Sequence, residues 1–291
     1  MLTIAYLGPE HTNTHIAAKK RFGKQARYVH APTVDDVFHR VERRQVDYGV
    51  VPIENSLAGS VTHTLDRFVD FVDTPVKVQG ELEQPIQHSL ILHRRTRLTA
   101  IRIIYSHPQA LAQCSQWLDK RLPNARREET DSTAEAVAQV LNPFRSETWV
   151  EGNRRVAKGP RPAERAAIAR AELAKGKTLR AIRVPQEHDN KTRFLILGFD
   201  EPHRGRRNKT SILFGVKDQP GALHEALLAF KRERINMNKI ESRPSKRKAW
   251  EYLFFVDIEG HGSEPRVKRA LKALERSTSL LRVLGSYPVG R

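Results

Sequence analysis

Short apolar runs alternate with amphipathic segments over the first 75 residues of the chain. The apolar runs, which have the composition of β-strands, are Leu2 to Leu7, Arg27 to Ala31 and Tyr48 to Val51. The segments between them carry apolar residues at helical spacing, and Thr33 with Asp36 three residues later forms a capping box. This alternation predicts an α/β fold with a parallel sheet, whose strand ends and loops are the usual place for a ligand.

A second α/β region is predicted from about Val76. Its strand-like runs are Val76 to Leu82, Ile86 to Leu92, Ile101 to Tyr105 and Arg180 to Val184. Its predicted helices are Ala110 to Leu122, a segment from Ser132 to Leu141 that opens with a second capping box, and the alanine-rich stretch Ala163 to Lys175. The stretch 142–162 has no clear periodicity, so we expect a long loop or insertion there.

The last part of the chain has an order of its own. After a strand from Phe194 to Phe199 and a basic linker at 200–209, the predicted elements are Thr210 to Val216, Pro220 to Arg232, Ile235 to Arg243, Trp250 to Ile258, Glu264 to Leu274 and Leu280 to Leu284. The order is βαββαβ, which is the ferredoxin-like pattern. A module of this kind usually needs cover on one sheet face, so we expect a homo-oligomer formed through it, either a dimer or a tetramer.

Composition adds a strong positive charge to this picture. The 291 residues include 51 Lys and Arg against 33 Asp and Glu, a formal net charge of +18. Such an excess suggests nucleic acid, a membrane surface or an anionic metabolite as a partner. No aromatic-interleaved basic stripe accompanies the charge, which argues against nucleic acid, and no run approaches the roughly 18 apolar residues of a membrane span. Much of the excess lies in Arg154 to Arg165 and Arg204 to Lys209, so we interpret it mainly as a solvated surface.

Compartment and disulfide content follow from two further features. The first residues lack a basic leader and a small-residue cleavage site, so we expect no signal peptide in this stretch. The single cysteine, Cys114, cannot form an intramolecular disulfide and is interpreted as a buried filler. Both features favour a cytoplasmic location.

Hydroxyl and amide side chains gather at predicted strand ends and helix starts. They are Thr12, Thr14, Asn55, Ser56, Ser106, Ser132, Thr133 and Thr192. Helix N-termini bind anions because their unpaired N–H groups and the helix dipole favour negative charge, so several of them in one site would hold a carboxylate-bearing metabolite. Each one alone could equally be an N-cap that only begins a helix. Phosphate-binding glycine loops and the nucleophile-elbow sequence do not occur, and His11 with His15 lacks a nearby third metal ligand.

Three of these stretches together resemble the prephenate dehydratase family. The first runs from Val51 to Val61, with Asn55-Ser56 inside it, and is followed by Thr64-Leu65-Asp66. The second is Ser106 to Cys114, and the third is the triplet Thr192-Arg193-Phe194. The resemblance covers nearly the whole chain, since the C-terminal module is similar to the ACT domain that follows the catalytic domain in this family.

The resemblance implies a fold and a domain division. The fold is a two-subdomain, periplasmic-binding-protein-like α/β catalytic region with its active site in the cleft between the subdomains, plus a ferredoxin-like ACT domain. The implied catalytic domain is 1–199, with subdomain 1 at about 1–75 and 180–199 and subdomain 2 at about 76–179. The linker is 200–209, and the ACT domain is 210–291.

The resemblance also implies a reaction and residue roles. Prephenate would lose carbon dioxide and its ring hydroxyl to give phenylpyruvate, on the route to phenylalanine and without a cofactor. Thr192 would donate a proton or hydrogen bond to the leaving group, with Asn55, Ser106 and Gln113 as polar partners. Arg193 is a candidate anchor for a substrate carboxylate, because its planar fork matches that group. Thr12, Thr14, Ser56, Ser132, Thr133 and Phe194 complete the expected substrate site.

The effector site is implied by two short motifs of the ACT-like module. Gly221-Ala222-Leu223 and Glu241-Ser242-Arg243-Pro244 resemble the segments that bind L-phenylalanine. A glycine-containing turn at a helix start leaves amide groups free for an amino-acid ligand. L-Phenylalanine is therefore the expected effector, and prephenate the expected substrate.

Departures from the family pattern keep alternatives open. The usual Gly-Pro-x-Gly-Thr-Phe-Ser is Gly8-Pro9-Glu10-His11-Thr12-Asn13-Thr14 here, and His224 stands where valine is frequent. Arogenate or a broader cyclohexadienyl substrate shares the ring and the leaving group. A non-catalytic amino-acid-binding regulator would keep the fold, although the intact Thr192-Arg193-Phe194 triplet argues against it.

Overall fold

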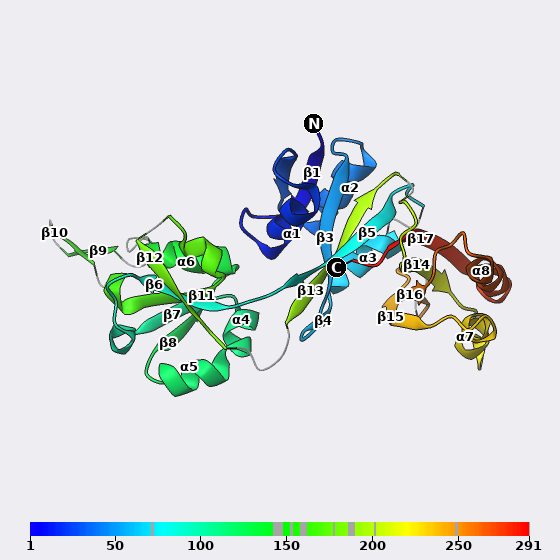
Figure 1. Cartoon of the computed structure of the whole chain (residues 1–291). Helices are drawn as coiled ribbons and strands as arrows, with labels where there is room; N and C mark the ends of the chain where they lie inside the picture. The colour runs from blue at the N-terminus through cyan, green and yellow to red at the C-terminus, as the bar shows by residue number, and fades with distance from the viewer. Residues whose placement is uncertain are drawn as a thin grey trace. The chain divides into compact units, whose positions relative to one another are not determined.

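The computed structural model describes residues 1–70, 73–141, 148–151, 154–157, 162–176, 178–185, 190–200, 202–247 and 250–290. The chain forms two compact units (Figure 1). Unit 1 comprises Met1–Gln84 and Lys191–Arg291, and unit 2 comprises Pro85–Asn190. Among the described residues, no helix is both long and apolar enough to cross a membrane.

Unit 1 begins with a six-stranded sheet, called here the first sheet. Its strands are β1 (Thr3–Leu7), β2 (Arg27–Ala31), β3 (Tyr48–Asn55), β4 (Gly59–Ser60), β5 (Lys77–Pro85) and β13 (Lys191–Gly198). The order is β2-β1-β3-β13-β5, with β4 paired to β3. β1 is parallel to both β2 and β3, whereas β13 is antiparallel to β3. The predicted parallel α/β pattern is therefore confirmed for β1, β2 and β3.

Helices cover both faces of the first sheet. α2 (Val34–Glu42) and α3 (Thr62–Asp70) bury Val37, Phe38, Leu65 and Phe68 on one face, and α1 (Asn13–Phe22) buries two alanines on the other. The Thr33 side chain accepts from Asp36 N, and the Asp36 carboxylate accepts in return from Thr33 N, which confirms the predicted capping box.

Two boundaries in unit 1 differ from the sequence-based expectation. β3 continues through Asn55, beyond the predicted strand end at Val51, and the chain then turns back as β4. β5 pairs beside β13 in the first sheet, so unit 1 extends to Gln84 instead of about residue 75. An apolar run shows that a strand is present but does not show which sheet contains it.

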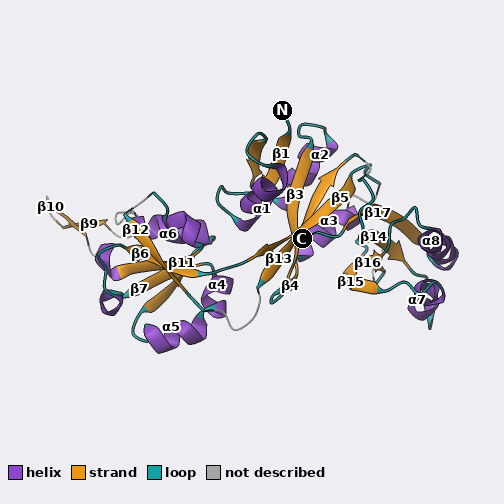
Figure 2. Cartoon of the chain, viewed as in Figure 1, coloured by secondary structure: helices purple, strands orange, loops and turns teal. Residues whose placement is uncertain are grey.

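Unit 2 contains a five-stranded sheet between helices (Figure 2). The strands are β6 (Ser89–His93), β7 (Ile103–Ser106), β8 (Arg126–Glu129), β11 (Arg165–Ala169) and β12 (Leu179–Arg183), in the order β12-β6-β11-β7-β8. α4 (Pro108–Gln113) and α5 (Ser115–Arg121) pack on one face, and α6 (Thr133–Leu141) packs on the other. The predicted helix 110–122 is thus interrupted at Cys114, which is buried as expected.

The alanine-rich stretch Ala163 to Lys175 is not a helix, which corrects the sequence-based prediction. Residues Arg165–Ala169 form β11, the central strand, and all five are buried. Alanine has the highest helix propensity, but a central strand covered on both faces is selected by its packing. Its small side chains allow helices to approach the sheet closely from both sides. The expected loop at 142–162 also contains a hairpin of β9 (Thr148–Glu151) and β10 (Arg154–Ala157); its remaining residues, apart from Pro162, lie outside the described ranges.

The C-terminal module of unit 1 has the predicted βαββαβ order. Its elements are β14 (Asn208–Gly215), α7 (Ala222–Arg232), β15 (Met237–Pro244), β16 (Tyr252–Glu259), α8 (Pro265–Ser277) and β17 (Leu280–Pro288). The four strands, called here the C-terminal sheet, have the order β15-β16-β14-β17. The ferredoxin-like fold is therefore confirmed.

The two faces of the C-terminal sheet are both covered within the chain. α7 and α8 pack on the face that carries Ile212, Phe214 and Val256. The opposite face carries Leu213, Leu253, Phe255, Leu284 and Tyr287, which join the core of the first sheet. The cover expected from a second copy is thus supplied by the same chain.

Candidate active site

Asn55 and Thr192 form a hydrogen-bonded pair at the ends of two adjacent strands. They are directly opposite each other in the register of β3 and β13. Asn55 Nδ2 donates to Thr192 Oγ1 at 2.9 Å and to the Lys191 carbonyl at 3.2 Å, while Asn55 Oδ1 accepts from two backbone amides at 3.0 and 3.1 Å. Because Thr192 Oγ1 accepts this bond, the hydroxyl proton is directed elsewhere. The pair is a fixed donor in a half-buried position.

Ser56 holds the start of β13 in place. Its Oγ accepts from Lys191 N at 2.9 Å, and its own N–H donates to the Lys191 carbonyl at 2.8 Å. Ser56 is exposed, so it both fixes the backbone beside Thr192 and borders solvent. The structure therefore brings together the predicted residues Asn55, Ser56 and Thr192.

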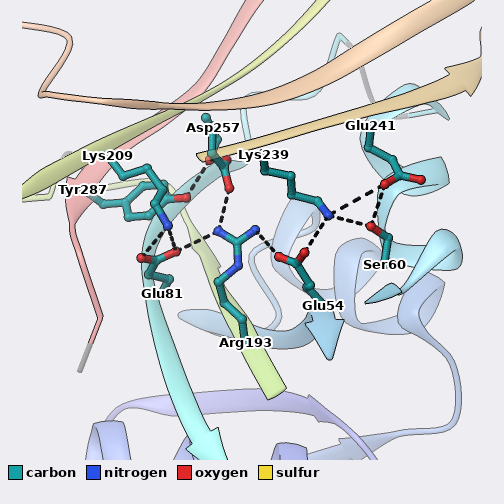
Figure 3. Close-up of polar contacts among 10 residues, drawn as sticks. Glu54, Ser60, Glu81, Arg193, Lys209, Lys239, Glu241, Asp257 and Tyr287 are labelled. Carbon is teal, nitrogen blue, oxygen red and sulfur yellow. Dashed lines mark hydrogen bonds and ion pairs between the residues drawn. The ribbon is translucent and has the colours of Figure 1, made fainter. Parts of the chain in front are cut away.

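Arg193 belongs to a group of charged residues that we call the ion cluster (Figure 3). Its Nη1 lies 3.0 Å from Glu81 and 2.5 Å from Asp257, and its Nη2 lies 3.0 Å from Glu54. The other members are Lys209, Lys239 and Glu241. The guanidinium is buried and bound to three carboxylates, so its surroundings do not favour the predicted role as a substrate anchor.

The partners of Arg193 could not be found from the sequence. Glu81 is on β5 and Asp257 is on β16, and no motif connects them to the triplet at 192–194. Burial alone lowers the pKa of Arg193, but the negative charge of Asp257 and its neighbours raises it, so the guanidinium stays protonated. Burial, with the charges of Asp257 and Glu81, raises the pKa of the neighbouring Tyr287 well above its usual value.

Gln113 belongs to a neutral group in unit 2 that we call the Gln113 cluster. Its Oε1 accepts from His88 Nε2 at 2.8 Å and from Asn190 Nδ2 at 2.8 Å. Because both donors contact the oxygen, the amide nitrogen of Gln113 is oriented as a donor in another direction. Both His88 and Asn190 are buried. Burial lowers the pKa of His88, the bond to Gln113 opposes this shift, and the charge of Arg170 adds to it.

Ser106 and Phe194 are both buried in the interior of the protein. Ser106 is fully buried, and its Oγ donates to the Ile168 carbonyl at 2.6 Å, which links β7 to β11. Phe194 is buried among Ile4, Tyr6 and other core residues of the first sheet. Ser106 thus anchors its motif in the sheet of unit 2, and Phe194 anchors its motif in the core of the first sheet.

The remaining predicted hydroxyl groups lie at helix starts. Thr12 Oγ1 accepts from His15 N at 3.3 Å and donates to the Leu7 carbonyl at 3.2 Å, and Ser132 Oγ accepts from Glu135 N at 3.1 Å. The bonds that Thr12 and Ser132 accept from His15 N and Glu135 N are capping bonds. Thr14 is buried in the first turn of α1, and Thr133 is half-buried in the first turn of α6.

His15, in the first turn of α1, packs against Tyr6 and His11. Its ring stacks on Tyr6 with centroids 4.4 Å apart, and its Nδ1 accepts from His11 N at 2.9 Å. Burial, with the charge of Lys19, lowers the pKa of His15 to about 4. The ring is therefore neutral near pH 7.

The predicted effector motifs border a cavity of about 730 Å³ in the C-terminal module. Its lining includes Gly221, Ala222, Leu223, Ser242, Trp250, Tyr252 and Phe254. Gly221 precedes α7 with φ of +81°, a conformation that glycine adopts without strain. The cavity thus combines a glycine-started helix with aromatic side chains.

The second effector motif divides between the two faces of β15. Ser242 lines the cavity, whereas Glu241 accepts from Ser60 Oγ at 2.7 Å and Arg243 contacts Asp66 at 2.7 Å on the opposite face. Pro244 is exposed at the strand end. Alternation along a strand separates these neighbours, so only Ser242 of the four residues lines the cavity.

The chain thus combines an α/β region that carries oriented hydroxyl and amide donors with a ferredoxin-like module that has a cavity of its own. Residues 4–202 match the family model described as prephenate dehydratase, and residues 210–276 match the ACT domain. The chain belongs to the prephenate dehydratase family.

Individual proteins agree with the family match. A bifunctional chorismate mutase/prephenate dehydratase of Aquifex aeolicus is 43% identical over 290 residues, covering 99% of this chain and 74% of that protein. A prephenate dehydratase of Methanocaldococcus jannaschii is 36% identical over 262 residues, covering 88% and 86%. The solved structure of the Arthrobacter aurescens prephenate dehydratase in complex with L-Phe has a TM-score of 0.84 at 31% identity, covering 99% and 90%.

Proposed function

We propose that this protein converts prephenate to phenylpyruvate, with release of carbon dioxide and water, and that L-phenylalanine regulates it. The observation that carries the proposal is the Asn55–Thr192 pair, in a chain whose residues 4–202 match the family. The reaction expels a ring hydroxyl as the carboxylate leaves, so a donor must stand where negative charge develops on the departing oxygen.

Thr192 fits that donor role because Asn55 fixes its oxygen and leaves its proton free to point toward a ligand. A threonine hydroxyl is a weak acid, so strong hydrogen-bond donation describes the step better than full proton transfer. The Gln113 amide, oriented by His88 and Asn190, supplies a second donor suited to an oxygen of the substrate. Ser56 and the capped helix starts at Thr12 and Ser132 are further candidates for contact with the two carboxylates.

The cavity of the C-terminal module is the proposed site for L-phenylalanine. Tyr252, Phe254 and Trp250 offer apolar surface for an aromatic ring, and the start of α7 at Gly221 offers backbone amides for a carboxylate. We also propose a homo-oligomer through this module, because β15 is an edge strand with Ile240 exposed. A cytoplasmic location, which fits a chain with one cysteine, is part of the same proposal.

The test uses the purified full chain with prephenate or arogenate, with and without L-phenylalanine. Formation of phenylpyruvate from prephenate, altered by L-phenylalanine, is the expected result. Faster formation of phenylalanine from arogenate would assign the alternative substrate. No turnover of either substrate would contradict the enzyme assignment, and light scattering of the same sample measures the oligomer.

A further inference from the structure

We infer that Arg193 is a positioning residue for Thr192 and that Asp257 of the C-terminal sheet holds it in place. The inference rests on the proposed function, since it concerns how the Thr192 donor is oriented. Arg193 directly follows Thr192 on β13, and successive strand residues point to opposite faces. Thr192 and Asn55 therefore lie on one face of the strand pair, with Arg193 and Glu54 behind them on the other.

The local pairing of β3 and β13 explains why such support is needed. Phe194 pairs with Pro52 and Arg193 pairs with Glu54, so Ile53 is an extra residue on β3. A bulge of this kind interrupts the ladder of backbone hydrogen bonds next to the Asn55–Thr192 pair. The ion pair between Arg193 Nη2 and Glu54 at 3.0 Å joins the two strands at the residue pair that borders the bulge.

The ion cluster fixes Arg193 from the far side (Figure 3). Asp257 lies 2.5 Å from Arg193 Nη1 and is itself fully buried, and its other oxygen accepts from Ser211 Oγ at 2.5 Å. Glu81 contacts the same Nη1 at 3.0 Å and is held by Lys209 at 2.8 Å. The guanidinium is thus clamped by carboxylates from β3, β5 and β16, two of them in the first sheet and one in the C-terminal sheet.

The same strand that supplies Asp257 also borders the effector cavity. Tyr252 and Phe254 of β16 line the cavity, whereas Leu253, Phe255 and Asp257 face the first sheet. A shift of β16 caused by a ligand in the cavity would therefore move the carboxylate that holds Arg193. The position of Thr192 thus depends on the C-terminal sheet through Asp257, while Lys209 of β14 and Lys239 of β15 reach the same cluster through Glu81 and Glu54.

The experiment compares kcat and KM for prephenate in full-length Arg193→Lys, Asp257→Asn and Glu54→Gln. Small displacements of a donor lower the rate without weakening substrate binding, so each variant should lose about 10- to 100-fold in kcat with KM within about threefold of the wild type. The Glu54 side chain is 36% exposed, so its variant tests the link from a position that tolerates substitution. Asp66→Asn is the matched control, because it removes the charge of another ion pair that joins the C-terminal sheet to the rest of unit 1, Arg243 of β15 with Asp66 of α3, and should keep the wild-type kcat.

Several outcomes would overturn the inference. A tenfold or greater rise in KM for Arg193→Lys with unchanged kcat would make Arg193 a substrate anchor. A wild-type kcat in either Asp257→Asn or Glu54→Gln would contradict the proposed chain of contacts. A decrease in kcat for Asp66→Asn as large as the decreases for those two variants would contradict it as well. A wild-type protein without turnover would instead contradict the proposed function.

Discussion

The two oriented donors of this protein are supported by clusters of opposite character. Thr192 in unit 1 lies in front of the ion cluster, where Arg193 is bound by Glu54, Glu81 and Asp257. Gln113 in unit 2 is held by two neutral groups, His88 and Asn190. The ion cluster joins the two sheets of unit 1, whereas the Gln113 cluster connects only its three members within unit 2.

The difference teaches how each donor depends on its surroundings. A buried ion cluster is strong only while its members are all present, because removal of one leaves another charge buried without compensation. A neutral hydrogen-bonded cluster carries a smaller penalty for each missing partner. We therefore expect Thr192 to be coupled to distant parts of unit 1 and Gln113 to respond mainly to its own two partners.

The largest expected effect is on stability in the ion cluster. Arg193→Ala leaves Glu81 and Asp257 buried together, so the free energy of unfolding should fall by about 3–5 kcal/mol. Gln113→Ala should cost about 1–3 kcal/mol, the range for a lost buried hydrogen-bond partner. Urea denaturation followed by circular dichroism measures both, and equal losses would remove the distinction. Arg269→Ala, which breaks an exposed pair with Glu233, should leave the urea midpoint unchanged.

The next effect is on the rate. Thr192→Ala removes the donor while Asn55 and the ion cluster remain, and kcat for prephenate should fall by about 100- to 1000-fold, as for other single donors of this kind. Thr192→Ser keeps the hydroxyl and should retain most of the activity. If Thr192→Ala and Thr192→Ser lost activity equally, backbone placement and not the hydroxyl would be the relevant feature.

The smallest expected effect is a pH dependence of the folding stability that arises from His88 in the Gln113 cluster. The pKa of His88 is lowered in the folded chain, mainly by burial, so the unfolded chain binds more protons than the folded chain once the pH falls below the ordinary histidine value near 6.5. Stability should therefore decrease as the pH falls through this range. The decrease should be smaller in His88→Gln, measured by urea denaturation at several pH values. An identical pH dependence in both proteins would show that His88 is protonated equally easily when folded.

Much of the fold follows from local patterns. The capping box at Thr33, the short strands of unit 1 and the βαββαβ order of the C-terminal module were all predictable, because each depends on residues close in sequence. The strand β11 was not, because its alanines favour a helix in isolation and are made a strand only by β6 and β7 on either side. The membership of β5 in the first sheet likewise depends on pairing with a segment more than 100 residues away.

Individual residues of the candidate site could be predicted from the sequence, but the contacts that hold them in place could not. The family resemblance implies Asn55 as a polar partner of Thr192, and in the register of β3 and β13 the two residues are directly opposite each other. The partners of Arg193 and the role of His88 depend on contacts between strands far apart in sequence, for which the chain has no local signal. A basic residue next to a catalytic candidate suggested substrate binding, although three buried carboxylates surround it.

The central claim is that Arg193 affects the reaction through Thr192, and a double-mutant cycle on kcat tests it most directly. The wild type, Thr192→Ala, Arg193→Lys and the double variant are compared with prephenate under the same conditions. If Arg193 acts by positioning the hydroxyl, Arg193→Lys should lower kcat about 10- to 100-fold in the wild type and by less than about threefold in the Thr192→Ala background. Equal losses in both backgrounds would show that the two residues act independently and would contradict the account.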